Sequence, residues 1–318
     1  MIARCLQTFV LCFLASGWLS LLSTNRQIRA STPTEDNQAL PRLLVEANRV
    51  VILGDSIAYS GQWISYLTCW METQGTAARV INMAIPSETV SGLSENGHAG
   101  GKFPRPFLHE RLDRVLRICR PDVVLACYGM NCGIYQPLDM NRFKKFQTGI
   151  HRLHRKVEQT GAQIIYLTPP IYDQRPGKQG PAGSADYDAV LEHYSEWLLT
   201  KRSSGWNVID VHGSMKKSLR RKHLSHPAFT FSPDTVHPGN EGHLAICRAI
   251  LNDFGVSPTW TPDSIQDILP RVTKRLEILR NAYLSAAGHN RPGIAEGLPI
   301  DEAITQANCM TKAIRAEE

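Results

Sequence analysis

Five short runs along the chain are apolar over most of their length. They comprise residues 49–53, 79–83, 122–128, 163–168 and 207–211. Runs of this length without polar alternation are typical of strands that are buried on both faces of a sheet. The pattern therefore predicts five strands of a parallel sheet, because the two faces of such a sheet are covered by helices.

Helical periodicity separates these runs. After the first run, apolar residues follow the i, i+3, i+4, i+7, i+8 spacing of one helix face: Trp63, Tyr66, Leu67, Trp70 and Met71. The same spacing predicts further helices over residues 108–119, 143–159, 187–199 and 241–254. Alternating strands and helices predict a parallel sheet between two helical layers.

Beyond residue 257 the pattern is helical only. Four apolar residues share one helix face, and Gly288 follows them as a stop: Val272, Leu276, Leu279 and Tyr283. A weaker stripe follows at Ile300, Ile304, Ala307 and Ile314. We therefore expect a main α/β domain over residues 45–257 and a C-terminal helical appendage over residues 258–318.

The first 30 residues predict a targeting segment. Arg4 precedes an apolar run over residues 5–22, and Ile28-Arg29-Ala30 resembles a cleavage site. The run is also about as long as a short membrane span, so a retained N-terminal anchor is the alternative. Residues 31–44 begin with a polar, proline-containing stretch and are expected to be a linker. These features predict a secreted or periplasmic protein.

Composition adds a local concentration of positive charge. The 318 residues are 42% hydrophobic and carry a net charge of +6 at pH 7. Much of the excess lies in one segment, at Lys216, Lys217, Arg220, Arg221 and Lys222. A solvated helix face explains the segment; an anionic partner, such as a polyanionic glycan or a lipid head group, is the alternative. Basic residues do not alternate with aromatic ones, so no nucleic-acid partner is predicted.

The cysteines leave two alternatives open. Six of them follow the predicted targeting segment: Cys69, Cys119, Cys127, Cys132, Cys247 and Cys309. In an exported protein some of them could form disulfides, whereas buried free thiols fit their places on helices and strands equally well. No Cys or His group has the spacing of metal ligands, so neither a metal nor another cofactor is predicted.

A candidate nucleophile follows the first predicted strand. Gly54-Asp55-Ser56 lies at the carboxyl end of that strand, where parallel sheets bind ligands. The N-terminus of the next helix would point at an oxyanion there. By itself the tripeptide is weak evidence, because it also makes an ordinary turn with a helix cap.

A candidate base lies far downstream, after the fifth strand. A hydroxyl nucleophile needs a base, and the base needs an acceptor that holds its tautomer. In Asp234-Thr235-Val236-His237 the carboxylate can reach Nδ1 of the histidine, which leaves Nε2 for Ser56. Taken alone, this motif could also bind a metal or cap a helix.

Two further segments offer hydrogen-bond donors at strand ends. Asn131 follows the third strand, where its amide can donate to the oxyanion of a tetrahedral intermediate. Residues 82–89 follow the second strand and present backbone N–H groups to the same crevice.

Together these segments resemble the SGNH, or GDSL-type, hydrolase superfamily over residues 48–255. The four matching blocks are Gly54-Asp55-Ser56, Asn82-x-x-Ile85-x-x-x-Thr89, Gly129-x-Asn131 and Asp234-x-x-His237. The resemblance implies a flavodoxin-like three-layer αβα sandwich with a central five-stranded parallel sheet. It also implies ester hydrolysis through a nucleophile, Ser56, a base, His237, and a carboxylate that orients the base, Asp234.

The resemblance further implies three oxyanion donors, and two positions depart from the family pattern. The donors are the Ser56 N–H, the second-block residue Ser87 and the Asn131 side chain. Ser87 stands where the family usually has glycine, so a positive φ there would strain the backbone. Cys132 stands where the third block commonly has aspartate, and we interpret it as structural rather than nucleophilic.

The sequence thus predicts a secreted serine ester hydrolase that forms an acyl-enzyme and deacylates, most simply deacetylates, a carbohydrate. A small-molecule or glycan ester is the expected substrate. The alternatives are a lipase- or thioesterase-type acylhydrolase, and a catalytically impaired glycan-binding protein that keeps the fold.

Four other histidines and one loop have no clear role in this site. His212, His223 and His226 are expected on the surface or in loops, and His98 is expected near the site without an evident partner. The loop over residues 169–184 either borders the substrate pocket or is a plain connection.

Overall fold

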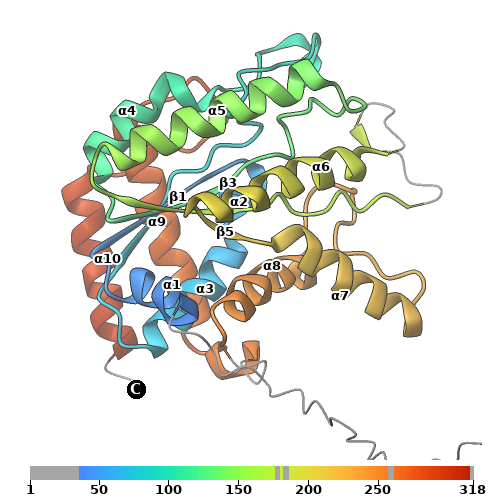
Figure 1. Cartoon of the computed structure of the whole chain (residues 1–318). Helices are drawn as coiled ribbons and strands as arrows, with labels where there is room; N and C mark the ends of the chain where they lie inside the picture. Colours follow the sequence, from blue (N-terminus) through green and yellow to red (C-terminus); the bar gives the residue numbers. More distant parts are fainter. Residues whose placement is uncertain (1–35, 176–179, 182–185, 257–260, 316–318) are drawn as a thin grey trace, which may run out of the picture. The chain divides into compact units, whose positions relative to one another are not determined.

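A five-stranded parallel sheet forms the centre of the computed structural model, which describes residues 36–175, 180–181, 186–256 and 261–315. The strands are β1 (Arg49–Gly54), β2 (Arg79–Asn82), β3 (Val123–Cys127), β4 (Gln163–Leu167) and β5 (Asn207–Ile209). Their order is β2-β1-β3-β4-β5, and every neighbouring pair is parallel. Figure 1 shows the sheet with helices around it. The predicted α/β fold is confirmed.

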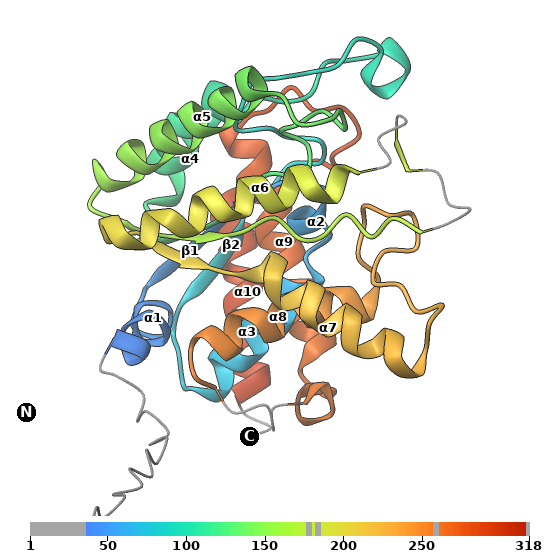
Figure 2. The ribbon, with the colours of Figure 1, turned by 45° about the vertical axis from the view of Figure 1, so that its right-hand side comes forward.

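Helices cover both faces of the sheet. On one face lie α3 (Gln62–Thr73) and α8 (Asn240–Asp253), which pack against each other. On the other face lie α4 (Leu108–Cys119), α5 (Met140–Glu158) and α6 (Tyr187–Thr200) (Figure 2). The predicted apolar stripes face inward, as Trp63 on α3 and Phe146 on α5 are fully buried. The three predicted layers are therefore present.

The strand order places a ligand crevice at the ends of β1 and β3. The chain moves from β1 to β2 on one side and then returns to β3 on the other side of β1. At such a reversal the connections leave in opposite directions, which opens a crevice at the carboxyl ends of the strands. The segments after β1, β2 and β3 all begin at this edge of the sheet.

The first described helix replaces most of the expected linker. Residues Asp36–Val45 form α1, in which Leu44 is fully buried and Leu40 and Leu43 pack against the core. The polar residues and Pro41 of this segment suggested a linker. However, Leu40, Leu43 and Leu44 have the spacing of one helix face. The predicted targeting segment, residues 1–30, lies outside the described residues.

The C-terminal helices α9 (Leu269–Ala287) and α10 (Ile300–Arg315) belong to the same compact unit as the sheet. The apolar stripe of α9 is buried because this helix packs against β2, α3 and α4, while α10 packs on α9. The boundary predicted at residue 257 stays a prediction.

The fifth strand is shorter than its apolar run, because Asp210 starts a helix. The Asp210 carboxylate accepts a hydrogen bond from the Gly213 N–H and so caps α7 (Val211–Ser225). The basic segment noted in the sequence therefore lies on α7.

All six cysteines after residue 30 are free thiols, and five of them are buried. Within the described ranges, none of the helices combines the length and the apolar character needed to cross a bilayer.

Candidate active site

Ser56 is the first residue of α2 (Ser56–Ser60), directly after β1. Asp55 caps this short helix by accepting a hydrogen bond from the Ile57 N–H at 3.0 Å. Asn82, at the end of β2, donates to the Ala58 carbonyl at 2.8 Å and ties α2 to the neighbouring strand. These contacts fix the backbone that presents the Ser56 hydroxyl.

The structure brings Ser56, His237 and Asp234 together in one hydrogen-bonded chain. The Ser56 Oγ lies 2.9 Å from Nε2 of His237, which is 181 residues away in the sequence. Nδ1 of His237 lies 2.7 Å from Oδ2 of Asp234. An ionised carboxylate at Nδ1 holds the proton on that nitrogen, so Nε2 presents its lone pair to the hydroxyl.

Asp234 also organises its own loop. Its Oδ1 accepts hydrogen bonds from the N–H groups of Val236 and His237, at 3.0 and 2.6 Å. Burial opposes ionisation of Asp234, but the hydrogen bonds from His237 outweigh it and hold the pKa of the carboxyl below its usual value. Asp234 is therefore a carboxylate at neutral pH.

A second aspartate, in the segment that follows β4, supports this loop. Asp173 is buried, and its Oδ2 accepts hydrogen bonds from Thr230 Oγ1 and the Phe231 N–H, both at 2.6 Å. Its own N–H donates to the Thr235 carbonyl at 2.9 Å. The loop after β4 therefore positions the segment that carries Asp234 and His237, a role that sequence reasoning did not assign.

Ser87 has a backbone φ of +68°, in the left-handed region that favours glycine. The sequence analysis expected a strained backbone at Ser87 if its φ were positive, and its φ is positive. A non-glycine residue in this region costs roughly 1 kcal/mol. The backbone N–H is kept, so this loop still has a donor at Ser87.

A buried ion pair holds the Ser87 turn in place. The next residue, Glu88, is 1% exposed, and its carboxylate receives two hydrogen bonds from the Arg111 guanidinium, at 2.6 and 2.7 Å. Arg111 also donates to the Met83 carbonyl, and the Tyr128 hydroxyl donates to Glu88 Oε2 at 2.6 Å. The cluster Glu88–Arg111–Tyr128 thus joins the ends of β2 and β3 to α4.

Asn131 is buried beside this loop, and its side-chain orientation is determined by its neighbours. Its Oδ1 accepts hydrogen bonds from Arg105 Nη1 at 2.8 Å and from the Tyr135 hydroxyl at 3.1 Å. Its Nδ2 lies 3.5 Å from the Glu88 carbonyl, a long contact that leaves the amide hydrogens largely available. Asn131 therefore lies directly beside the loop that carries Ser87.

Arg105 is a site-supporting residue that the sequence analysis missed. Its guanidinium forms two hydrogen bonds of 2.6 Å with Glu95, in the loop that contains His98. His98 does have a partner, since its Nδ1 lies 3.3 Å from Glu95 Oε1. Nothing in the local pattern of this glycine-rich loop indicates these contacts.

Two expectations about other residues have clear outcomes. His212 is not a surface or loop residue: it is buried in the first turn of α7, where its N–H donates to Thr168 Oγ1. It is buried because α7 begins two residues after the end of β5, which places His212 against Thr168 at the end of the neighbouring strand β4. Cys132 is also fully buried, and burial raises the pKa of its thiol to about 12, so the thiol stays protonated at neutral pH.

Across the part of the chain that the structure describes, no group of three His, Cys, Asp or Glu side chains could hold a metal ion. The arrangement is instead a hydroxyl, an imidazole and a carboxylate in series, and the Ser87 turn and Asn131 follow the two strands on either side of the strand that carries Ser56. This constellation can transfer an acyl group through a serine ester.

Comparison with known proteins gives one family and several structural neighbours. The model of the GDSL-like lipase/acylhydrolase family matches residues 52–245, which include all five predicted site residues. No curated protein matches the chain.

Solved structures of similar fold include three informative neighbours. A catalytic mutant of Axe2, an acetylxylan esterase from Geobacillus stearothermophilus, has a TM-score of 0.52 and 17% identity, over 67% of this chain and 97% of that one. A gut microbial diltiazem-metabolizing enzyme has a TM-score of 0.54 and 19% identity, over 65% of this chain and 47% of that one. LAE5, an alpha/beta hydrolase from the metagenome of Lake Arreo, has a TM-score of 0.50 and 21% identity, over 66% and 95%. At these identities the neighbours share the fold.

Removing the buried Glu88 charge should destabilise the protein. Glu88→Gln leaves the Arg111 guanidinium buried without its ion-pair partner, which typically costs about 3–5 kcal/mol. Urea unfolding measures this loss. The matched variant Glu296→Gln removes an exposed carboxylate and should change the free energy of unfolding by less than about 0.5 kcal/mol. Similar losses in both variants would contradict the role given to the buried pair.

Asp55 should make stability depend on pH. Burial raises the pKa of this carboxyl to about 6, against the opposing effect of the Ile57 N–H and of the nearby His237 and Arg105. Because the folded state holds the proton more tightly than the unfolded state, this group lowers the free energy of unfolding as pH rises through 6. The full loss above pH 7 is roughly 3 kcal/mol.

The variant Asp55→Asn isolates this effect, since its amide oxygen can still accept from the Ile57 N–H. Its stability relative to the unmodified protein should rise by up to about 3 kcal/mol between pH 4 and pH 8, measured by denaturant unfolding at each pH. The same substitution at the exposed Asp301 is the matched control for removing one carboxylate. A flat difference for Asp55→Asn would show that its carboxyl titrates normally.

Proposed function

This chain belongs to the GDSL-like lipase/acylhydrolase family and is a carboxylic ester hydrolase, and from this premise we propose that Ser56, His237 and Asp234 are its catalytic triad. The observation that carries the proposal is the continuous contact from Ser56 Oγ to His237 Nε2, at 2.9 Å, and from His237 Nδ1 to Asp234, at 2.7 Å.

The proposed reaction has two steps. His237 Nε2 takes the hydroxyl proton as Ser56 Oγ attacks the ester carbonyl, and the protonated imidazole then gives this proton to the departing alcohol. The acyl group stays on Ser56 as an ester. In the second step His237 takes a proton from water, the water attacks the acyl-enzyme, and the proton returns to Ser56 as the carboxylic acid leaves.

The negative oxygen of each tetrahedral intermediate requires hydrogen-bond donors that are already in position. We assign this role to the backbone N–H groups of Ser56 and Ser87 and to the Asn131 amide. Two features support the assignment: Asn131 Oδ1 is held by Arg105 and Tyr135, and the Ser87 turn is held by the Glu88–Arg111–Tyr128 cluster. Preorganised donors of this kind typically contribute about 10²–10³-fold each to kcat.

As substrate we propose a small acyl ester of a carbohydrate, most simply an acetyl ester. The resemblance of the fold to an acetylxylan esterase supports this choice, as does the export predicted from residues 1–30. The departures at Ser87 and Cys132, with the left-handed backbone of Ser87, favour one alternative of another class, a glycan-binding protein without turnover.

Replacing Ser56 tests the mechanism. Ser56→Ala should lower kcat/KM for p-nitrophenyl acetate by at least ~10³-fold and abolish labelling by a fluorophosphonate probe. Ser60→Ala is the matched control, because Ser60 lies on the same short helix and also contacts a histidine, His243, at 3.1 Å. It should keep activity within about twofold. Equal effects of the two substitutions would refute Ser56 as the nucleophile.

A substrate panel separates the remaining alternatives. The unmodified protein should release acetate from acetylated xylan and other acetylated sugars faster than it cleaves long-chain p-nitrophenyl esters or thioesters. The opposite preference would favour a lipase- or thioesterase-type enzyme. Binding of glycans without turnover of any ester would favour the non-catalytic alternative.

We also propose that residues 1–30 direct export, after which the protein is secreted or periplasmic. The basic start, the apolar run and Ile28-Arg29-Ala30 support this proposal. N-terminal sequencing of protein recovered from the periplasm or the medium should begin near Ser31. Membrane-bound protein that keeps Met1 would instead indicate the N-terminal anchor.

A further inference from the structure

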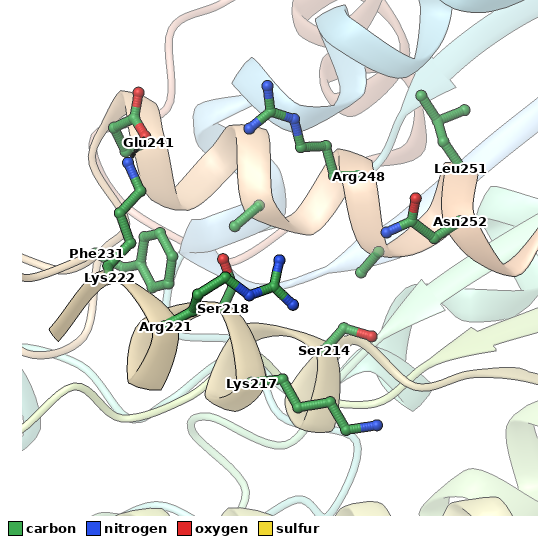
Figure 3. A pocket seen from close by; sticks show the side chains of 12 residues that line it. Ser214, Lys217, Ser218, Arg221, Lys222, Phe231, Glu241, Arg248, Leu251 and Asn252 are labelled. Carbon is green, nitrogen blue, oxygen red and sulfur yellow. Dashed lines mark hydrogen bonds and ion pairs between the residues drawn. The ribbon is translucent and has the colours of Figure 1, made fainter. Parts of the chain in front are cut away.

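A groove with a volume of about 480 Å³ lies between α7 and α8. We call it the α7–α8 groove. Four cationic side chains line it, Lys217, Arg221 and Lys222 from α7 and Arg248 from α8, together with polar groups of Ser214, Ser218 and Asn252 (Figure 3). In Figure 3 the Arg221 guanidinium lies in the space between the two helices.

Three of these cations, Lys217, Arg221 and Arg248, have no carboxylate partner within 4 Å among the described residues, whereas Lys216 and Lys222 do. Lys216, on another side of α7, pairs with Asp188 at 3.1 Å. Lys222, at the end of the groove, pairs with Glu241 at 3.1 Å. The groove thus carries three cationic side chains without a carboxylate partner, and the guanidinium of one of them, Arg221, lies between the two helices. Such a cleft focuses its field and attracts anions.

The groove begins close to the catalytic loop. Phe231 and Glu241 line its near end, and Glu241 is in the first turn of the helix that follows His237. From there the groove follows α8 to Asn252, over about three helical turns or roughly 16 Å. A polymer that lies in the groove thus leads toward the segment that carries His237.

We propose that the α7–α8 groove binds the acidic sugar units of a polyanionic glycan, so that the ester substrate is an acylated acidic polysaccharide. This inference rests on the proposed function and names its substrate class. Arginine guanidinium groups match carboxylates and sulfates through paired N–H donors. The hydroxyl groups of Ser214 and Ser218 and the amide of Asn252 suit the hydroxyl groups of sugars.

The packing of α7 favours a glycan over a membrane surface. A helix that binds a bilayer presents an apolar face to it. On α7 the apolar residues Val211 and Met215 are buried and Leu219 packs against the core, which leaves Leu224 as its exposed large apolar side chain, 87% exposed. A single leucine at the end of the helix does not form an apolar face.

Binding of a labelled oligogalacturonate of about ten units, followed by fluorescence anisotropy with the full chain, tests the proposal. A neutral xylo-oligosaccharide of equal length is the comparison ligand and should bind more weakly. The triple variant Lys217→Gln, Arg221→Gln and Arg248→Gln should raise the Kd for oligogalacturonate by roughly tenfold or more. Added salt should weaken binding to the unmodified protein.

A matched triple variant controls for net charge. Arg117→Gln, Lys144→Gln and Arg155→Gln removes the same charge from exposed positions on α4 and α5, on the opposite face of the sheet. Its Kd should stay within about twofold of the unmodified value. Equal weakening by both triple variants, or no affinity for oligogalacturonate, would overturn the proposal. Binding to phosphatidylglycerol vesicles without affinity for oligogalacturonate would overturn it in favour of a membrane surface.

The binding assay and the esterase assay test the two proposals separately, so one proposal can be refuted while the other holds. Oligogalacturonate carries no ester, so its Kd does not depend on Ser56 as nucleophile. If esters are not cleaved but the Kd pattern holds, the groove stands and the hydrolase proposal fails. If both proposals hold, the groove variant should raise KM for acetylated polygalacturonate more than for acetylated xylan, and the α4–α5 variant should change neither.

Discussion

The buried ion pair between Glu88 and Arg111 is the interaction on which the site depends most. It anchors the loop after β2 to α4, and the Tyr128 hydroxyl extends the anchor to the end of β3. Because β1 lies between β2 and β3, Ser56 is presented between two segments that are tied to each other. An ion pair this deeply buried is costly to desolvate, and its geometric specificity is its clearest contribution.

The contact between Ser56 and His237 joins two segments that are 181 residues apart in the sequence. Ser56 and His237 meet only because α8 returns to the face of the sheet that carries α3, which brings the preceding loop to the end of β1. Asp173 then holds that loop through three hydrogen-bonding groups of residues 230–232. The contacts among Ser56, His237 and Asp234 thus depend on the loop after β4 as much as on β1, although that loop contributes none of the three residues.

The sequence predicted the sheet, and the motifs it singled out at Ser56, Asp234 and His237 come together in the structure, because both follow local rules. Apolar runs mark buried strands, and short motifs at strand ends place Ser56 and His237 at one edge. The supporting residues were missed since their roles depend on how loops fold: Arg105, Glu95 and Asp173 act through contacts with residues remote in the sequence. His212 was misplaced for a related reason, as Asp210 ends the fifth strand two residues before its apolar run does.

The two departures from the family pattern have different physical weight. Cys132 replaces a carboxylate, yet the orientation of Asn131 does not need one, because Arg105 and Tyr135 already occupy its side-chain oxygen. Ser87 is costlier, since a side chain must be carried at a φ of +68°. The turn nevertheless keeps its shape, because the next residue, Glu88, is held by hydrogen bonds from Arg111 and Tyr128. The donor geometry is therefore supported by neighbouring residues rather than by glycine at the turn itself.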